Sequence, residues 1–166
     1  MNQQEQNFNT DISVALQFLK EHYELVMATS ENNVPNMRIF QIMKMEGTTL
    51  YFATAPQKDV YLQLVKNPRI EILSFYDKVM VRCKGVADFN VDTEVAQWIY
   101  DNNPVLPRLY ERPDLLKYFK LEIAELDYYD LKPTPPIFKH FNLKENTEGN
   151  GFVGSRYSGL HPSPLR

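Results

Sequence analysis

Two periodicities follow each other along the chain, and they predict one helix followed by a series of strands. Near the N-terminus, apolar residues recur at the spacing of a single helix face, and Thr10 or Asp11 can cap this helix. Its apolar positions are Ile12, Ala15, Leu16 and Leu19. From residue 25 onward the apolar positions come in short runs or alternate with polar ones, which is typical of strands.

Six segments have the apolar, β-branched and aromatic composition of strands. In chain order they are LVMATS (25–30), MRIFQIMKM (37–45), LYFATA (50–55), RIEILSFYD (69–77), KVMVRCKGVADF (78–89) and FKLEIAEL (119–126). Short turns join the first three as an antiparallel meander, and further helices are expected at 57–66 and from Asp92 to Asn103. We therefore predict a mainly β protein, a six-stranded antiparallel barrel, closed or nearly closed, with flanking helices.

The character of the chain changes after Leu131. The segment KPTPPIFKHFNLK is rich in proline, and the remainder holds four of the six glycines of the sequence. We interpret residues 1–131 as one barrel domain and residues 132–166 as a C-terminal extension, either mobile or laid across a partner subunit.

Composition argues against a membrane or secreted protein, a metal site and a reactive cysteine. No apolar run approaches the ~20 residues that span a bilayer, and the N-terminus lacks the features of a signal peptide, so we expect a cytoplasmic protein without membrane partners. The three histidines, His22, His140 and His161, lack companions at ligand spacing, so no metal site is expected. Cys83 alternates with apolar strand residues, which favours an inert core thiol.

Charge is unevenly distributed. The net charge of −3 argues against a nucleic-acid partner, yet residues 34–84 carry eight basic and four acidic side chains, a net charge of +4. A pocket for a small anion would produce this pattern, although scatter of surface charge explains it as well. In YFATAPQKDVYLQL, Lys58 falls at the second or third residue of a predicted helix, where a cation is unfavourable unless an anion lies between it and the helix.

The order of these segments resembles that of the pyridoxamine 5'-phosphate oxidase-like family, the FMN-binding split barrels. Four local sequences carry the resemblance over roughly residues 11–130: LVMATSENNVPNMRIF, LYFATAPQK, YLQLVKNPRIEIL and VMVRCKGVADF. The resemblance implies an antiparallel split β-barrel that forms a homodimer, with two equivalent FMN sites at the subunit interface and a small-molecule substrate.

The resemblance also implies which residues bind the cofactor. In the family an arginine on the second strand, a threonine ending the third and a lysine beginning the next helix hold the FMN phosphate, and the matching positions are Arg38, Thr54 and Lys58. A phosphate dianion does favour a charged donor, a hydroxyl and free helix N–H groups together. Ile39 and Phe40 would lie beside the isoalloxazine ring.

Arg82 lies in the segment that the family contributes from the second subunit, which makes it a further candidate for FMN binding. Each of these residues also has an ordinary explanation. Arg38 could be solvated or salt-bridged, Thr54 could reflect β propensity alone, and Lys58 could be a surface lysine.

Departures from the family argue against vitamin B6 oxidation. True pyridoxamine-phosphate oxidases carry a lysine and a glutamine at the positions of Met43 and Met80, and their C-terminal arginine motif has no convincing equivalent around Arg156 or Arg166. The sequence looks more like the short general stress and nitroimidazole-reductase-like flavoproteins. We expect an FMN-dependent oxidoreductase of unknown substrate, and we predict no catalytic residue.

Two alternatives stay open at this point. The first is a carrier, sensor or stress-response protein that binds FMN or haem without turnover, with His22 or His140 available to the iron. The second is a barrel with an empty pocket that acts through dimer-mediated interaction, which predicts that Arg38 and Lys58 can be changed without consequence.

Overall fold

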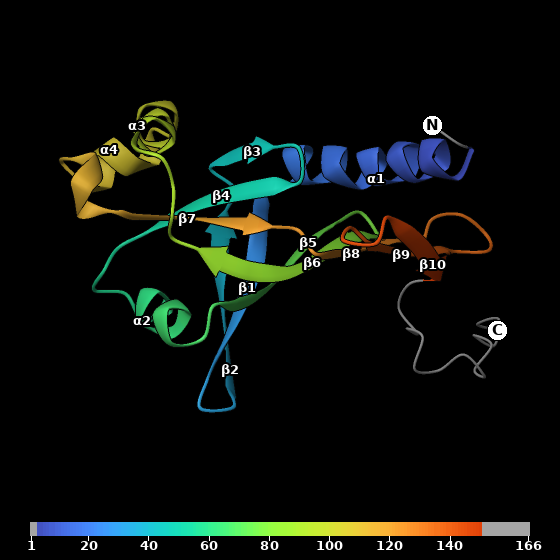
Figure 1. The fold of residues 1–166 in the computed structure, drawn as a ribbon, viewed down its shortest axis with the longest axis horizontal. Coiled ribbons are helices and arrows are strands. Elements are labelled where there is room, and N and C mark those ends of the chain that lie inside the picture. Colours follow the sequence, from blue (N-terminus) through green and yellow to red (C-terminus); the bar gives the residue numbers. More distant parts are fainter. Residues whose placement is uncertain (1–2, 151–166) are drawn as a thin grey trace.

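A curled antiparallel sheet forms the centre of the molecule (Figure 1). The structure is a computed structural model that describes residues 3–150. Its strands are β1 (Glu24–Glu31), β2 (Val34–Gln41), β3 (Lys44–Glu46), β4 (Thr49–Thr54), β5 (Arg69–Tyr76), β6 (Val79–Asp88), β7 (Lys117–Glu122), β8 (Glu125–Asp130), β9 (Ile137–Asn142) and β10 (Thr147–Asn150). The prediction of a mainly β, antiparallel barrel fold is confirmed.

The sheet has two parts that share β6. One part follows the order β10-β9-β8-β6-β5-β1-β2, and in the other β3 pairs with β4, β4 with β7, and β7 with the end of β6. Gly85 makes this junction possible, because a Cβ atom there would lie 2.4 Å from Leu121 Cδ1 and 2.5 Å from the carbonyl oxygen of Glu122. The absence of a side chain at Gly85 therefore allows β6 and β7 to approach closely.

The described part has ten strands where the sequence predicts six, and two of the extra strands arise at barrel corners. After β2, the N–H of Ile42 donates to Tyr23 and that of Met43 to Tyr51, so the backbone changes its partner from β1 to β4. After β7, Ile123 donates to Thr48 and Ala124 to Lys84 in the same way. Each long predicted strand is thereby divided in two.

The other two extra strands lie in the C-terminal extension, for which the sequence predicts no strand. β9 pairs with β8 and β10 pairs with β9, so residues 137–150 continue the sheet and are not a detached tail. Residues 151–166 lie outside the described residues, and the domain division at residue 131 stays a prediction.

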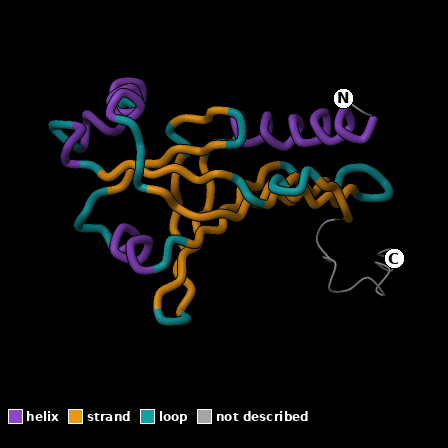
Figure 2. Tube along the Cα trace, viewed as in Figure 1, coloured by secondary structure: helices purple, strands orange, loops and turns teal. Residues whose placement is uncertain are grey.

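Helices lie outside the strands (Figure 2). They are α1 (Gln3–Glu21), α2 (Asp59–Lys66), α3 (Thr93–Asn102), α4 (Val105–Leu109) and the short 3-10 helix η1 (Pro113–Leu115). The predicted cap at Thr10 or Asp11 is wrong, because α1 begins at Gln3, where the first four residues, Gln-Gln-Glu-Gln, have good helix propensity. No helix within residues 3–150 combines the length and apolarity needed to cross a membrane.

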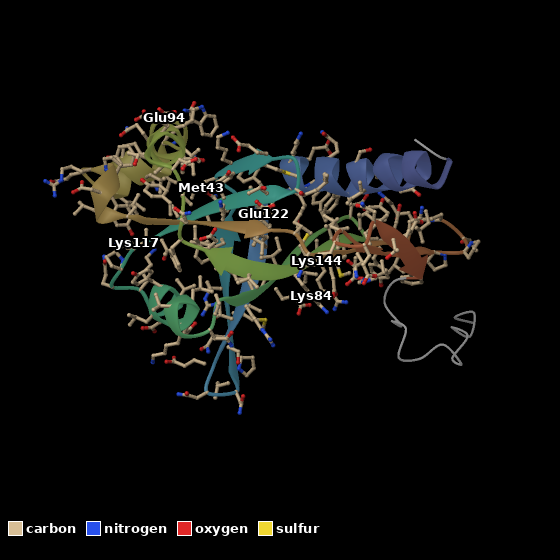
Figure 3. The ribbon with its side chains drawn as sticks, viewed as in Figure 1. Met43, Lys84, Glu94, Lys117, Glu122 and Lys144 are labelled. Atoms are coloured by element: carbon tan, nitrogen blue, oxygen red, sulfur yellow. The ribbon has the colours of Figure 1, made fainter. Side chains whose placement is uncertain are left out.

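Alternation along the strands builds the main core. Inward residues of β1, β4, β6 and β7 meet the apolar face of α1 and are fully buried, among them Met27, Phe52, Val81 and Phe119. A smaller hydrophobic cluster packs α3, α4 and η1 against the outside of β4 and β7. Its buried residues are Tyr51, Ile99, Tyr100, Leu106 and Leu116. Met43 packs against this second cluster (Figure 3). The two cores fix the elements between which the site lies.

Candidate functional site

Arg38 on β2 is held by two buried polar side chains. Its Nη1 donates to Thr29 Oγ1 at 2.7 Å and its Nη2 donates to Gln63 Oε1 at 2.7 Å. The Thr29 hydroxyl in turn donates to Gln63 Oε1 at 2.6 Å. Thr29 comes from β1 and Gln63 from α2, and both residues are buried. A strand pair and a helix therefore fix one guanidinium.

The guanidinium of Arg38 has only neutral hydrogen-bond partners among the described residues. Besides Thr29 and Gln63 these are the carbonyl oxygens of Asn36, at 3.3 Å, and Met27, at 3.5 Å. Partial burial lowers the pKa of Arg38, an effect that the charge of Asp59 offsets in part, and arginine stays protonated under all ordinary conditions. A positive charge is thus oriented here without an ion pair to neutralise it.

Thr54 ends β4 and presents an unpartnered hydroxyl. The residue is 2% exposed, and its Oγ1 is buried with no hydrogen-bond partner within residues 3–150. A buried hydroxyl without a partner costs about 1–3 kcal/mol. Such an atom is accounted for when a ligand oxygen completes its hydrogen bond.

Lys58 lies at the N-cap of α2, directly before the first helical residue, whereas the sequence predicts it at the second or third residue of the helix. Its side chain is exposed, and its own backbone N–H donates to the carbonyl oxygen of Ala55 at 3.0 Å. The N–H groups of Asp59 and Val60, the first two of the helix, have no intrahelical acceptor, whereas that of Tyr61 donates to the carbonyl oxygen of Lys58 at 3.0 Å. The cationic side chain and these N–H groups converge on the same end of α2, which suits an anion.

A single pocket of about 480 Å³ joins these groups. Five of the six predicted cofactor residues line it, namely Arg38, Ile39, Phe40, Thr54 and Lys58. An apolar wall of the same pocket is formed by α4 and its surroundings, namely Val105, Leu106, Leu109, Tyr110 and Leu116. The lining thus combines groups that suit a phosphate with apolar side chains that suit a flat ring, so the residues present fit FMN.

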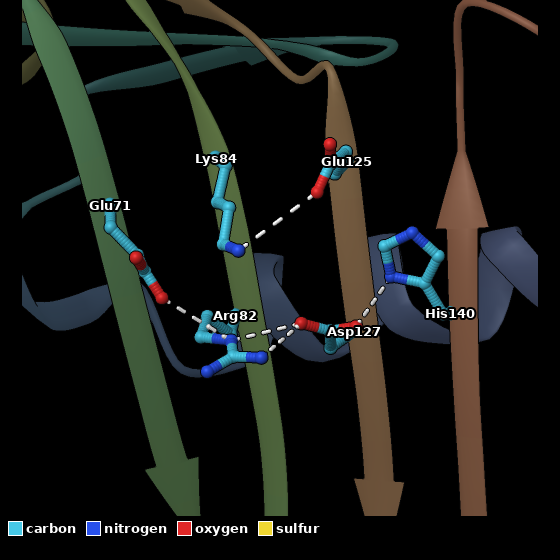
Figure 4. Close-up of polar contacts among 6 residues, drawn as sticks. All are labelled: Glu71, Arg82, Lys84, Glu125, Asp127 and His140. Carbon is cyan, nitrogen blue, oxygen red and sulfur yellow. Dashed lines mark hydrogen bonds and ion pairs between the residues drawn. The ribbon is translucent and has the colours of Figure 1, made fainter. Parts of the chain in front are cut away.

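Arg82, the sixth predicted residue, lies elsewhere on the sheet (Figure 4). Its Nε and Nη2 donate to Asp127 Oδ2 at 2.9 and 2.6 Å, and Nε lies 3.3 Å from a carboxylate oxygen of Glu71. The second oxygen of Asp127 is 2.7 Å from His140 Nδ1. Within one chain Arg82 belongs to an ion-pair network outside the pocket, and its contact with a cofactor stays a prediction.

Sequence reasoning missed Thr29, Gln63 and the apolar wall. Thr29 follows Leu25 and Met27 on the inward side of β1, and Gln63 lies next to Leu64 on the buried face of α2. A polar side chain on an otherwise apolar face was the available signal, since a buried polar group needs a partner. The apolar wall formed by α4 contains no such polar residue, so the sequence offered no signal for it.

The other candidate side chains lie away from the pocket. His22 packs between Phe18 and Tyr76, with ring centroids 4.6 and 4.3 Å apart. Cys83 is completely buried, and this burial, more than the nearby charge of Asp127, raises the pKa of its thiol. Among residues 3–150 no three His, Cys, Asp or Glu side chains are placed to share a metal ion.

Comparison with known proteins gives one family and a set of related folds. The family model described as pyridoxamine 5'-phosphate oxidase matches residues 14–130. No curated protein matches the sequence.

Three solved structures illustrate the likeness. A NimC/NimA family protein from Clostridium acetobutylicum is 24% identical, with a TM-score of 0.67 over 79% of this chain and 92% of that one. A pyridoxamine 5'-phosphate oxidase-related, FMN-binding protein from Nostoc punctiforme is 14% identical, with a TM-score of 0.61 over 86% and 94% of the two chains. A heme-binding protein from Mycobacterium smegmatis is 12% identical, with a TM-score of 0.62 over 77% and 56%. At these identities the likeness shows the fold.

Proposed function

The chain belongs to the pyridoxamine 5'-phosphate oxidase family, and from this premise we propose that it is an FMN-binding flavoprotein acting as an FMN-dependent oxidoreductase on a small molecule. The observation that carries the proposal is one pocket lined by four features: the Arg38 guanidinium with its neutral partners, the buried Thr54 hydroxyl that has no partner among the described residues, Lys58 at the N-terminus of α2, and an apolar wall. These groups match the two chemically different ends of FMN.

Each pocket residue has a distinct part in binding. Arg38 would donate to the phosphate through Nε and the second hydrogen of Nη2, which have no acceptor within residues 3–150. Thr54 would donate its hydroxyl, and Lys58 would add charge at the pocket rim. Ile39 and Phe40 would lie along the ring, where the apolar wall excludes water.

Bound FMN supplies hydride and electron transfer, so the protein's contribution is binding and orientation. The described lining of the pocket contains no Asp, Glu, His or Cys, and we assign no catalytic acid or base. Met43 lines the pocket at the position where true pyridoxamine-phosphate oxidases have a lysine, so vitamin B6 oxidation stays outside the proposal. The substrate is a small molecule of a class still to be found.

We include in the proposal that a second copy of the chain completes the site. Ile39, which lines the pocket, is 69% exposed, and Met37 on the same side of β2 is 73% exposed. Phe75 on β5 is also largely exposed. Apolar side chains of this kind favour a protein partner. A homodimer in the cytoplasm would cover them.

The visible spectrum of the freshly purified protein tests the proposal. Flavin bands near ~450 nm that are present in the wild type and lost in the double variant Arg38→Ala, Lys58→Ala are the expected result. A colourless protein that does not bind added FMN would refute FMN binding. Flavin retained at full occupancy by the double variant would refute this pocket as its site.

A carrier that binds its cofactor without turnover is the second candidate, and the absence of Asp, Glu, His and Cys from the described pocket lining favours it. Steady oxidation of NADH or NADPH with an added acceptor supports the enzyme, whereas bound flavin without any oxidation supports the carrier. Haem would give a band near ~400 nm instead. Both described histidines, His22 and His140, lie outside the pocket, which disfavours axial ligation of haem there.

A further inference from the structure

We propose that Thr29 and Gln63 are positioning residues that make the pocket selective for a phosphate monoester over the same molecule without its phosphate. They would do so by holding the Arg38 guanidinium in place while leaving its charge available. This inference rests on the proposed function, since it concerns how the same pocket distinguishes FMN from riboflavin.

The three side chains form a closed set of hydrogen bonds. Gln63 Oε1 accepts from both Arg38 Nη2 and the Thr29 hydroxyl, while Thr29 Oγ1 also accepts from Arg38 Nη1. The orientation of the Gln63 amide follows from this arrangement, because its nitrogen in the same place would face two donors. Thr29 is 4% and Gln63 5% exposed, so water does not replace these contacts.

The two acceptor oxygens imitate a carboxylate without its charge. Thr29 Oγ1 and Gln63 Oε1 are 2.6 Å apart and receive two nitrogens of one guanidinium, as the two oxygens of a bidentate carboxylate do. A carboxylate in this position would orient Arg38 equally well, but it would neutralise the charge and repel a phosphate. The neutral pair orients Arg38 without forming an ion pair with it.

Selectivity for phosphate follows from this arrangement. Nε and one hydrogen of Nη2 remain without an acceptor in the described part of the chain. An oriented cation with free donors binds an anion more strongly than a mobile one, because less side-chain entropy is lost on binding. Riboflavin, which lacks the phosphate, gains nothing from it.

The variant Gln63→Glu tests the inference, with dissociation constants for FMN and for riboflavin measured by flavin fluorescence on the cofactor-free protein. The substitution keeps the size of the side chain and the two acceptor positions while adding a negative charge. We expect FMN binding to weaken by at least about tenfold and riboflavin binding to stay within about twofold of the wild type. Val65→Glu is the matched control, because it adds the same charge to an exposed position of the same helix and should change neither value.

The outcomes separate the inference from the function on which it rests. If the wild type binds FMN and Gln63→Glu binds it equally well, or loses FMN and riboflavin to the same extent, the positioning role is overturned while FMN binding stands. If the wild type binds neither flavin, the proposed function fails, and the positioning role fails with it.

A second pair of variants keeps the test decisive if Gln63→Glu does not fold, as judged by circular dichroism. Thr29→Ser retains the hydroxyl and should keep the wild-type ratio of FMN to riboflavin affinity, whereas Thr29→Val removes it and should lower that ratio severalfold. An unchanged ratio in Thr29→Val would overturn the inference.

Discussion

Two arginines of one sheet are held in opposite ways. Arg38 on β2 is oriented by Thr29 and Gln63, which are neutral, and Arg82 on β6 is oriented by Asp127 and Glu71, which are carboxylates. The geometry of the contacts is similar, with hydrogen bonds of 2.7 Å in the first group and 2.6–2.9 Å in the second.

The two arginines differ in whether their charge is paired with a carboxylate. The charge of Arg82 is balanced inside the chain, so it contributes to the sheet itself, where β5, β6, β8 and β9 are joined by the network in Figure 4. Arg38 forms no ion pair with any residue that the structure describes, and it lines a pocket. Under the proposed function, the neutral partners of Arg38 would leave it available to bind an anion, whereas the carboxylate partners of Arg82 hold it in the sheet.

The largest effect on stability should come from the Arg82 network. Asp127→Asn keeps the shape of a side chain that is 8% exposed but removes the charge that faces Arg82 and His140. Because Arg82 is itself 31% exposed, we expect a loss of about 2 kcal/mol in the free energy of unfolding, less than for a fully buried pair. Urea unfolding followed by circular dichroism measures it.

The control is Glu125→Gln, which removes the 3.9 Å contact between Lys84 and Glu125 on the same face of the sheet. Both side chains are more than 40% exposed, so the loss should stay below about 1 kcal/mol. Equal losses in the two variants would show that Asp127 has no special place in the sheet.

A smaller effect on the free energy of unfolding should distinguish Thr54, which lines the pocket, from Thr29, which holds Arg38. Removing the hydroxyl should change stability in opposite directions at the two positions. Thr54→Val removes a buried hydroxyl that has no partner in the described chain, so the ligand-free protein should be as stable as the wild type or more stable by up to about 1 kcal/mol. Thr29→Val removes a hydroxyl with two partners and should destabilise by about 1–2 kcal/mol. Thermal unfolding without flavin gives both values, and destabilisation by Thr54→Val would contradict the assignment of its hydroxyl to a ligand.

The smallest effect concerns Cys83, which neighbours Arg82 but points into the core. Its burial raises the pKa of the thiol, so the reactive thiolate is scarce at neutral pH. A thiol reagent such as 5,5'-dithiobis(2-nitrobenzoic acid) should leave the native protein unmodified and label one thiol per chain after unfolding in urea. Rapid labelling of the native protein would place Cys83 outside the core.

Much of the fold could be predicted because its signals are local. The strand-like composition of β1 and β5, the alternation in β6 and the start of α3 after Asp92 were visible in the sequence. The corners after β2 and β7 were not, because the apolar pattern continues through them while the hydrogen-bond partner changes. The pairing of β9 and β10 was obscured by the prolines and glycines around them.

The candidate site was predicted in part for the same reason. The order of segments brought Arg38, Thr54 and Lys58 together in prediction, and the structure places all three around one pocket. The order of segments could not indicate that Arg38 forms a hydrogen bond with Gln63, 25 residues away, or that Arg82 forms one with Asp127, 45 residues away. These contacts depend on the packing of α2 and β8. The charge of each partner determines whether the arginine forms an ion pair within the chain.

The FMN affinity of Arg38→Ala, set beside that of Arg82→Ala and the wild type, tests the central claim most directly. Charged hydrogen bonds are worth about 1.5–3 kcal/mol, so Arg38→Ala should bind FMN roughly 10- to 100-fold more weakly, while Arg82→Ala should lose several times less. Fluorescence titration of FMN into the three cofactor-free proteins gives the values. The account is contradicted if Arg38→Ala binds FMN as tightly as the wild type, or loses no more affinity than Arg82→Ala.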